Sequence, residues 1–179
     1  MGELPTRIVL VGFMGAGKSV VGARLAQRLG YRFEDMDRRI EKRTGRSIPA
    51  LFEERGEEAF REEEEREAVS LAQLDRRVIA TGGGAFARPG TRARLQEGAV
   101  TVWIRIDFDT VIERIRPDGT RPLAGNRGIM RALLAEREPS YCLADLVVDT
   151  GRGTTPAGVA ERIVDLIEKR AAQENAAKQ

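Results

Sequence analysis

A glycine-rich segment near the start of the chain has the residue types that bind nucleotide phosphates. Residues Gly12–Ser19 read GFMGAGKS and match the pattern GxxxxGK[ST]. In such a loop, backbone N–H groups and the start of the following helix surround phosphate oxygens, and Lys18 adds a cation for the β and γ phosphates. The Ser19 hydroxyl group is suited to bind Mg²⁺. The pattern therefore predicts a site for ATP and Mg²⁺.

Two aspartates form a second feature with chemical potential. Asp35 and Asp37 follow a short segment at Tyr31–Phe33 that weakly favours a strand. In a doubly wound sheet, ligands bind beyond the carboxyl ends of the strands, so we expect both carboxylates to face the phosphates. One carboxylate suits Mg²⁺ or its water shell, and the other can accept a proton from an attacking hydroxyl group. A helix-capping role is the alternative.

A run of three glycines forms the third feature. Gly82–Gly84 follow Thr81 and the apolar segment Val78–Ala80. Consecutive glycines expose backbone N–H groups and let a ligand touch the main chain. A tight turn from strand to helix is the alternative. We favour a ligand contact, because the run also lies at the carboxyl end of a predicted strand.

The residue inventory narrows the possible chemistry. The chain contains 0 His and 1 Cys. Without histidine there is no Ser-His or Cys-His nucleophile system and no histidine zinc site. Cys142 alone forms neither a disulfide within the chain nor a cysteine zinc site. Catalysis must therefore use carboxylates, arginine, lysine, hydroxyl groups or backbone N–H groups.

Five apolar segments supply strands that would position these features. Segments with helical periodicity lie between them. This alternation predicts an α/β fold, with a doubly wound, five-stranded parallel sheet covered by helices on both faces. The segment at Tyr31–Phe33 is the weakest of the five, and the other four are Ile8–Val11, Val78–Ala80, Val100–Ile106 and Leu146–Val148.

The length of 179 residues fits one domain, so we expect a single unit over residues 1–179 with a core over about 8–170. Glu57–Leu74 predicts one long helix, on which the Glu62–Glu65 run is mostly solvated and Arg61 can pair with Glu64 near the inner face. Residues 116–127 are rich in glycine, proline and arginine and predict a mobile loop. We expect the tail at 171–179 to be disordered.

Charge and hydropathy exclude several kinds of partner. The 30 basic and 28 acidic residues give a net charge of +2 without a long basic block, so no nucleic-acid partner is expected. Residues 1–7 lack the features of a signal peptide, and no apolar run approaches the roughly 18 residues of a membrane span. With a single cysteine, we expect a cytoplasmic protein. We also expect no membrane partner, and a monomer.

The phosphate-binding loop occurs in switches, motors and small-molecule kinases. A GTPase would need a guanine-reading NKxD element, which the sequence lacks. A motor or transporter ATPase usually needs a larger chain. A kinase of a small metabolite therefore fits best, and a nucleotide-sensing module, which would not need Asp37, is the alternative.

Six segments, taken in order, resemble those of shikimate kinases. The resemblance runs from about Ile8 to Ile167 and implies a P-loop architecture like that of nucleoside monophosphate kinases. It implies transfer of the γ-phosphoryl group of ATP, with Mg²⁺, to the 3-hydroxyl group of shikimate in aromatic amino-acid biosynthesis. The segments are GFMGAGKS at 12–19, FEDMD at 33–37, GEEAFR at 56–61, ATGGG at 80–84, RPL at 121–123 and REPSY at 137–141.

The resemblance also implies roles for catalytic and metal-binding residues. Lys18 would hold the β and γ phosphates, and Arg121 would lie on a lid over them. Asp37 would orient and deprotonate the shikimate hydroxyl group. Ser19 would hold Mg²⁺ directly, and Asp35 would do so through water.

Further residues are implied to bind the two substrates. Arg61 and Arg137 would bind the shikimate carboxylate, a planar anion that suits guanidinium forks, and Gly82, Gly83 and Gly84 would line that pocket. Another small-metabolite kinase, of gluconate or a nucleoside monophosphate, would lack this arginine pair and is the second alternative. The implied ATP-binding residues are Gly12, Gly15, Ala16, Gly17, Lys18, Ser19, Val20, Arg121, and, flanking adenine, Arg114 and Arg152.

Overall fold

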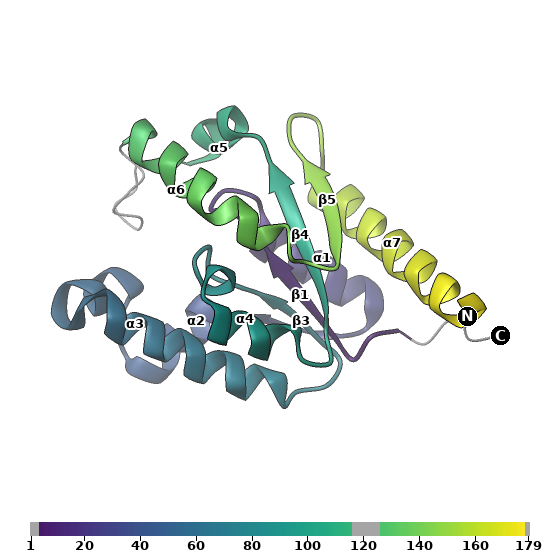
Figure 1. The fold of residues 1–179 in the computed structure, drawn as a ribbon, viewed down its shortest axis with the longest axis horizontal. Coiled ribbons are helices and arrows are strands. Elements are labelled where there is room, and N and C mark those ends of the chain that lie inside the picture. The colour runs from purple at the N-terminus through teal and green to yellow at the C-terminus, as the bar shows by residue number, and fades with distance from the viewer. Residues whose placement is uncertain (1–3, 116–125, 178–179) are drawn as a thin grey trace.

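The computed structural model describes residues 4–115 and 126–177, and it contains a five-stranded parallel sheet (Figure 1). The strand order is β2-β3-β1-β4-β5, and every neighbouring pair is parallel. The predicted α/β fold with five parallel strands is confirmed. The strands are β1 (Arg7–Val11), β2 (Arg32–Asp35), β3 (Arg77–Ala80), β4 (Val100–Ile106) and β5 (Leu146–Thr150).

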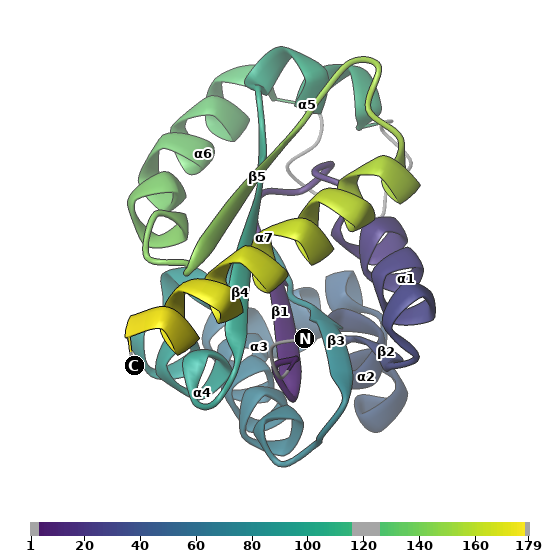
Figure 2. The same cartoon turned by 90° about the vertical axis from the view of Figure 1, so that its right-hand side faces the viewer.

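Helices cover both faces of this sheet. Helices α1 and α7 pack together on one side, and α3, α4 and α6 lie on the other (Figure 2). Helix α2 packs on α3 beside β2, the strand at one edge. The helices are α1 (Lys18–Leu29), α2 (Met36–Thr44), α3 (Ile48–Ala72), the 3₁₀ turn η1 (Ala85–Ala87), α4 (Pro89–Gln96), α5 (Phe108–Arg114), α6 (Arg127–Tyr141) and α7 (Pro156–Ala177).

The hydrophobic core lies between the sheet and these helices. Residues Ile8–Val11 of the central strand β1 are all buried, as are Val102 and Ile104 of β4. A parallel strand that is covered on both faces has a continuous apolar run instead of an alternating one, which explains the strand pattern in the sequence. Because all strands are parallel, their carboxyl ends lie at one edge, where the phosphate-binding loop, the aspartates and the glycine run begin.

The long helix differs from its prediction. Helix α3 begins at Ile48, well before Glu57, and it is interrupted at Gly56, whose backbone angles of φ 79° and ψ 173° are not helical. Glycine adopts this positive φ without steric cost, so the chain can bend there and continue as a helix. The expectation of a mostly solvated glutamate run is wrong for Glu63, which is buried, whereas Glu64 is buried beside Arg61, as their spacing predicted.

The C-terminal tail and the end of the predicted loop at 116–127 also differ from expectation. Helix α7 continues to Ala177, so residues 171–177 are helical where we expected a disordered tail. This segment is rich in alanine, glutamine and glutamate, which favour helices, and Arg170 pairs with Glu174 one turn later. Of the predicted lid, residues 116–125 lie outside the described residues, whereas Asn126 caps α6 and Arg127 begins it. Within the described ranges, no helix is both long enough and apolar enough to cross a membrane.

Candidate active site

The glycine-rich loop connects β1 to α1 at the carboxyl edge of the sheet. Gly12, Gly15 and Gly17 all have positive φ angles, of 138°, 78° and 91°. A Cβ atom on Gly12 would lie 2.5 Å from the carbonyl oxygen of Ile104, so the loop passes too close to β4 for any side chain. Helix α1 then begins at Lys18, and its N-terminal N–H groups face the loop. The local structure is therefore that of a phosphate-binding loop.

Lys18 is held over this loop by hydrogen bonds to main-chain oxygens. Its ammonium group donates to the carbonyl oxygens of Gly12 at 2.7 Å and Phe13 at 2.9 Å. The side chain is only 9% exposed, although it carries a charge. A buried cation that contacts carbonyl dipoles beside a helix N-terminus is suited to bind phosphate oxygens.

The two carboxylate oxygens of Asp35 each accept a hydrogen bond. Oδ1 accepts a hydrogen bond from the backbone N–H group of Arg38 at 3.3 Å and so caps α2. Oδ2 accepts from the Ser19 hydroxyl group at 2.7 Å. The capping alternative is therefore confirmed for Asp35, and it leaves the second oxygen beside Ser19.

These two side chains fit a magnesium ion by their chemistry. Mg²⁺ prefers hard oxygen ligands, keeps several waters and is usually held by one or two protein groups together with substrate phosphates. Ser19 and Asp35 supply one hydroxyl and one carboxylate oxygen, 2.7 Å apart, next to the phosphate-binding loop. Among the described residues there is no cluster of three or more acidic, cysteine or histidine side chains that would hold a metal by itself.

The three glycines each make room for a charged side chain. A Cβ atom on Gly82 would lie 2.7 Å from Oδ1 of Asp37 and 2.9 Å from Oε1 of Glu64. One on Gly84 would lie 2.5 Å from Nη1 of Arg61. At Gly83 the nearest atom is Nη1 of Arg137, at 3.4 Å. The glycine run is therefore the surface against which four charged side chains are brought together.

Arg61 lies on the inner face of α3 and is 9% exposed. Its Nη1 donates to Glu64 at 2.6 Å, which confirms the pairing predicted from their spacing. Its Nε and Nη2 donate to Glu57 at 3.2 Å and 2.9 Å. These carboxylates fix the guanidinium plane against Gly84.

Glu64 is a site residue that sequence reasoning placed only as a partner of Arg61. Its side chain is 1% exposed, and burial raises the pKa of its carboxyl group above the ordinary range. Arg61 opposes this rise, Asp37 adds to it, and Arg137 opposes it. The only signal in the sequence was the spacing of three residues from Arg61.

The raised pKa of Glu64 predicts how stability depends on pH. The folded protein holds this proton more tightly than the unfolded chain, so Glu64 contributes stability at low pH that is lost as pH rises from about 4.5 through its folded pKa. Glu64→Gln lacks this loss, so we expect its unfolding free energy to rise relative to wild type across this window, by at most about 1.4 kcal/mol per pH unit. Urea unfolding of both proteins at several pH values measures this slope, and a slope of opposite sign would contradict it.

Tyr141 connects α6 to the glycine run. Its hydroxyl group donates to the carbonyl oxygen of Gly83, and its ring, which is fully buried, packs on Trp103. Burial raises the pKa of Tyr141 to about 12, although the nearby Arg137 and Arg61 act in the opposite direction. The neutral phenol therefore anchors the last turn of α6, with Arg137 one turn earlier, against Gly83.

The arginines expected near adenine lie at the other end of the loop. Arg114 donates to the carbonyl oxygens of Gly15 at 3.4 Å and Gly151 at 3.0 Å, and so bridges the phosphate-binding loop and the turn after β5. Arg152 is exposed and pairs with Glu113 of α5. Arg121, the expected lid residue, lies outside the described residues.

One cleft of about 410 Å³ brings most of the predicted residues together. Of the others, Gly12 and Ala16 are buried within the loop, Arg61 packs against Gly84 without lining the cleft, and Arg152 does not line it either. The lining residues are Met14, Gly15, Gly17, Lys18, Ser19, Val20, Asp35, Asp37, Thr81, Gly82, Gly83, Arg114 and Arg137.

Comparisons of the sequence with known proteins give one family. The profile of the shikimate kinase family, SKI, matches residues 14–168. A shikimate kinase of Bradyrhizobium diazoefficiens is 42% identical over 173 residues, which cover 95% of this chain and 83% of that protein. A shikimate kinase of Caulobacter vibrioides is 46% identical over 156 residues, which cover 86% of this chain and 77% of that protein.

The structure was also compared with solved structures, and a shikimate kinase is among those that it resembles. A shikimate kinase from Acinetobacter baumannii in complex with shikimate superposes with a TM-score of 0.89 at 36% identity, and covers 94% of this chain and 96% of that one. A gluconokinase from Sinorhizobium meliloti superposes with a TM-score of 0.62 at 18% identity, over 99% of both chains. At that identity, the likeness to the gluconokinase shows a shared fold alone.

Proposed function

The chain belongs to the shikimate kinase family, and from this premise we propose that its cleft transfers the γ-phosphoryl group of ATP to the 3-hydroxyl group of shikimate. The products are 3-phosphoshikimate and ADP. The observation that supports this assignment is that one cleft joins the phosphate-binding residues Lys18 and Ser19 to Asp37 and Arg137. A donor site and an acceptor site thus share one cleft.

At the donor end, we assign Lys18 and the loop to the phosphates of ATP. Phosphoryl transfer depends mainly on positioning and on neutralising the charge of the phosphoryl oxygens. The ammonium group of Lys18 and the N–H groups of the loop supply this neutralisation. Ser19, and Asp35 through water, would hold Mg²⁺, which when bound adds positive charge at the β and γ oxygens. Arg114 lies beside the same loop, where the base of the nucleotide would reach.

At the acceptor end, we assign Asp37 to the reacting hydroxyl group and the arginines to the carboxylate. The carboxylate of Asp37 lies at Gly82, where it can orient the hydroxyl group and accept its proton. The guanidinium groups of Arg61 and Arg137 lie at Gly84 and Gly83. A substrate with a carboxylate at one end and a hydroxyl group at the other matches this separation of charge, as shikimate does.

We also propose that the enzyme acts in the cytoplasm and as a monomer. Cys142 is exposed with a free thiol, which suits a reducing compartment. The phosphate-binding loop, Asp37 and Arg137 of a single chain already line one cleft for both substrates.

The arginine assignment predicts a selective loss of shikimate binding. Arg137→Ala removes a charge-assisted contact to the carboxylate and should cost about 2–4 kcal/mol in kcat/KM for shikimate, with KM for ATP nearly unchanged. Arg61→Ala should act in the same direction, and Arg→Lys at either position should rescue only part, because an ammonium group cannot form the fork. ADP release under varied shikimate and varied ATP measures both constants.

The same assay tests the alternative acceptors. Wild type should release ADP with shikimate far faster than with gluconate, quinate or nucleoside monophosphates. Arg131→Ala, which removes an exposed arginine elsewhere on α6, serves as a control for Arg137→Ala. A rise in KM for ATP, with shikimate kinetics unchanged, would mean that the arginines serve the other substrate.

A further inference from the structure

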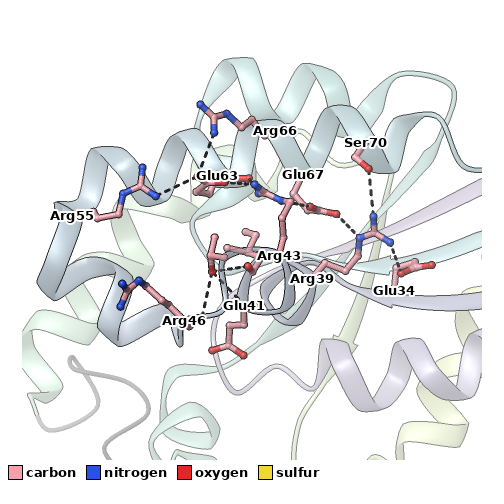
Figure 3. Close-up of polar contacts among 12 residues, drawn as sticks. Glu34, Arg39, Glu41, Arg43, Arg46, Arg55, Glu63, Arg66, Glu67 and Ser70 are labelled. Atoms are coloured by element: carbon pink, nitrogen blue, oxygen red, sulfur yellow. Dashed lines mark hydrogen bonds and ion pairs between the residues drawn. The ribbon is translucent and has the colours of Figure 1, made fainter.

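A second hollow, of about 830 Å³, lies between α2, α3 and the edge strand β2, and its walls carry charged side chains (Figure 3). It shares Asp35 with the catalytic cleft. Here Arg39 and Arg43 of α2 face Glu63 and Glu67 of α3. We call these four residues the α2–α3 ladder. None of them was assigned a role above.

The contacts of the ladder are short, and its acidic members are buried. Arg39 pairs through Nε with Glu67. Arg43 pairs with Glu63 at 2.5 Å and with Glu67 at 3.4 Å. The side chains of Glu63 and Glu67 are 5% and 4% exposed, whereas those of Arg39 and Arg43 are 32% and 40% exposed. Glu67 and Arg43 form the centre of the ladder, since each contacts both members on the other helix, and Glu67 is the buried one of the two.

The spacing on both helices explains why the four side chains meet. Arg39 and Arg43 are four residues apart, as are Glu63 and Glu67, so each pair lies on one face of its helix. The contacts continue from Arg39 to Glu34 of β2 at 2.9 Å. Glu34 in turn pairs with Arg77 of the neighbouring strand β3 at 3.3 Å. The ladder therefore ties α2 both to α3 and to the edge of the sheet.

Apart from the ladder, helix α2 is attached to α3 by Glu41, whose carboxylate accepts a hydrogen bond from the N–H group of Ile48 at 3.0 Å, and by a small apolar face. Only Met36 and Ile40 of its nine residues are buried, and they lie four apart along one line of the helix. Two apolar anchors on one line constrain rotation of the helix about that line less than contacts on a second face do. The ladder holds a different face, and a buried carboxylate left without its cation is costly, so the ladder resists such rotation.

The catalytic side chains depend on this orientation. Asp35 caps α2, and Asp37 lies in its first turn. Arg61 and Glu64 lie on α3, next to Glu63. We propose that the α2–α3 ladder is a positioning device, in which Glu67 is the central positioning residue that sets the Asp37 carboxylate relative to Arg61 and Gly82. This inference rests on the proposed role of Asp37 as proton acceptor.

The test removes the charge of Glu67 and keeps its shape. Glu67→Gln should lower kcat/KM for shikimate about tenfold, because small displacements of a reacting group have large kinetic effects, and KM for ATP should stay within about twofold. Arg39→Gln, which changes a half-exposed residue, should have a similar effect and serves if Glu67→Gln does not fold. The double variant should lose no more than the worse single variant, since both act through one contact. Arg39→Lys should recover part of the loss.

A matched control separates positioning from stability. Arg28→Gln breaks an ion pair with Glu161 that joins α1 to α7 away from the cleft, and should leave both substrate constants unchanged. If Glu67→Gln and Arg39→Gln lower only the melting temperature, with shikimate kinetics like those of Arg28→Gln, the ladder has only a structural role and the proposal is overturned.

Asp37→Asn, measured in the same series, distinguishes a failure of the proposed function of Asp37 from a failure of the positioning proposal. If Asp37→Asn keeps wild-type kcat, the proposed function of Asp37 fails. If Asp37→Asn is inactive while the ladder variants match Arg28→Gln, only the positioning proposal fails. We expect Glu67→Gln, Arg39→Gln and the double variant all to lose kcat/KM for shikimate, and Arg39→Lys to recover part of that loss.

Discussion

Lys18→Ala should lose about a thousandfold or more in kcat, because the reaction depends on neutralising the charge of the phosphoryl oxygens and has little other chemistry to rely on. Alanine at this position removes the cation at the start of α1. The protein should still fold, since the Lys18 ammonium group contacts the carbonyl oxygens of Gly12 and Phe13 and not the apolar core.

The measurement is ADP release at saturating shikimate, together with thermal unfolding. Lys169→Ala, an exposed lysine on α7, is the matched control and should keep wild-type rates. Lys18→Ala with an unchanged melting temperature and wild-type turnover would remove the loop from the mechanism.

Asp37→Asn is expected to have the second-largest effect. The amide keeps the size of the side chain and some hydrogen bonding but cannot accept the proton, so kcat should fall by about 10²–10⁴ while KM for ATP changes little. Turnover at saturating substrates, measured between pH 6 and 9, gives this loss. Its size should exceed that of any ladder variant, because in the proposed mechanism Asp37 contacts the reacting hydroxyl group and the ladder acts only through Asp37.

Asp35→Asn separates the roles of the two aspartates. Asparagine caps helices about as well as aspartate, so the start of α2 should be kept. The loss of charge beside Ser19 should instead raise the Mg²⁺ concentration needed for half-maximal rate. A Mg²⁺ titration of both variants decides the assignment: a shifted requirement in Asp37→Asn with none in Asp35→Asn would reverse it.

The sheet and the phosphate-binding loop could be predicted because they depend on local residue types. The strand at Val100–Ile106 was predicted with the observed bounds, since a buried parallel strand needs a continuous apolar run. The loop at Gly12–Ser19 was visible because its backbone angles need glycine at fixed positions. These signals lie within a few neighbouring residues.

The remaining features depend on contacts between distant segments. The predicted helix begins at Glu57, directly after the interruption at Gly56, but the sequence pattern did not reveal the helical residues 48–55 that precede it. Helix α6 was not predicted at all, and Pro139 in its last turns lowers its helical propensity. The sequence linked Glu64 only to Arg61 on the same helix, because its other charged neighbours, Asp37 of α2 and Arg137 of α6, come from distant segments.

The glycine wall has a consequence for inhibitor design. Gly82–Gly84 present no side chains, and the space beside them is bounded by the charged groups of Asp37, Glu64, Arg61 and Arg137. A competitor for the acceptor pocket therefore gains little from added apolar surface there. With the proposed roles of these residues, selective compounds need an anionic group for the guanidinium pair and a hydrogen-bond donor for the carboxylate, spaced as the three glycines place them.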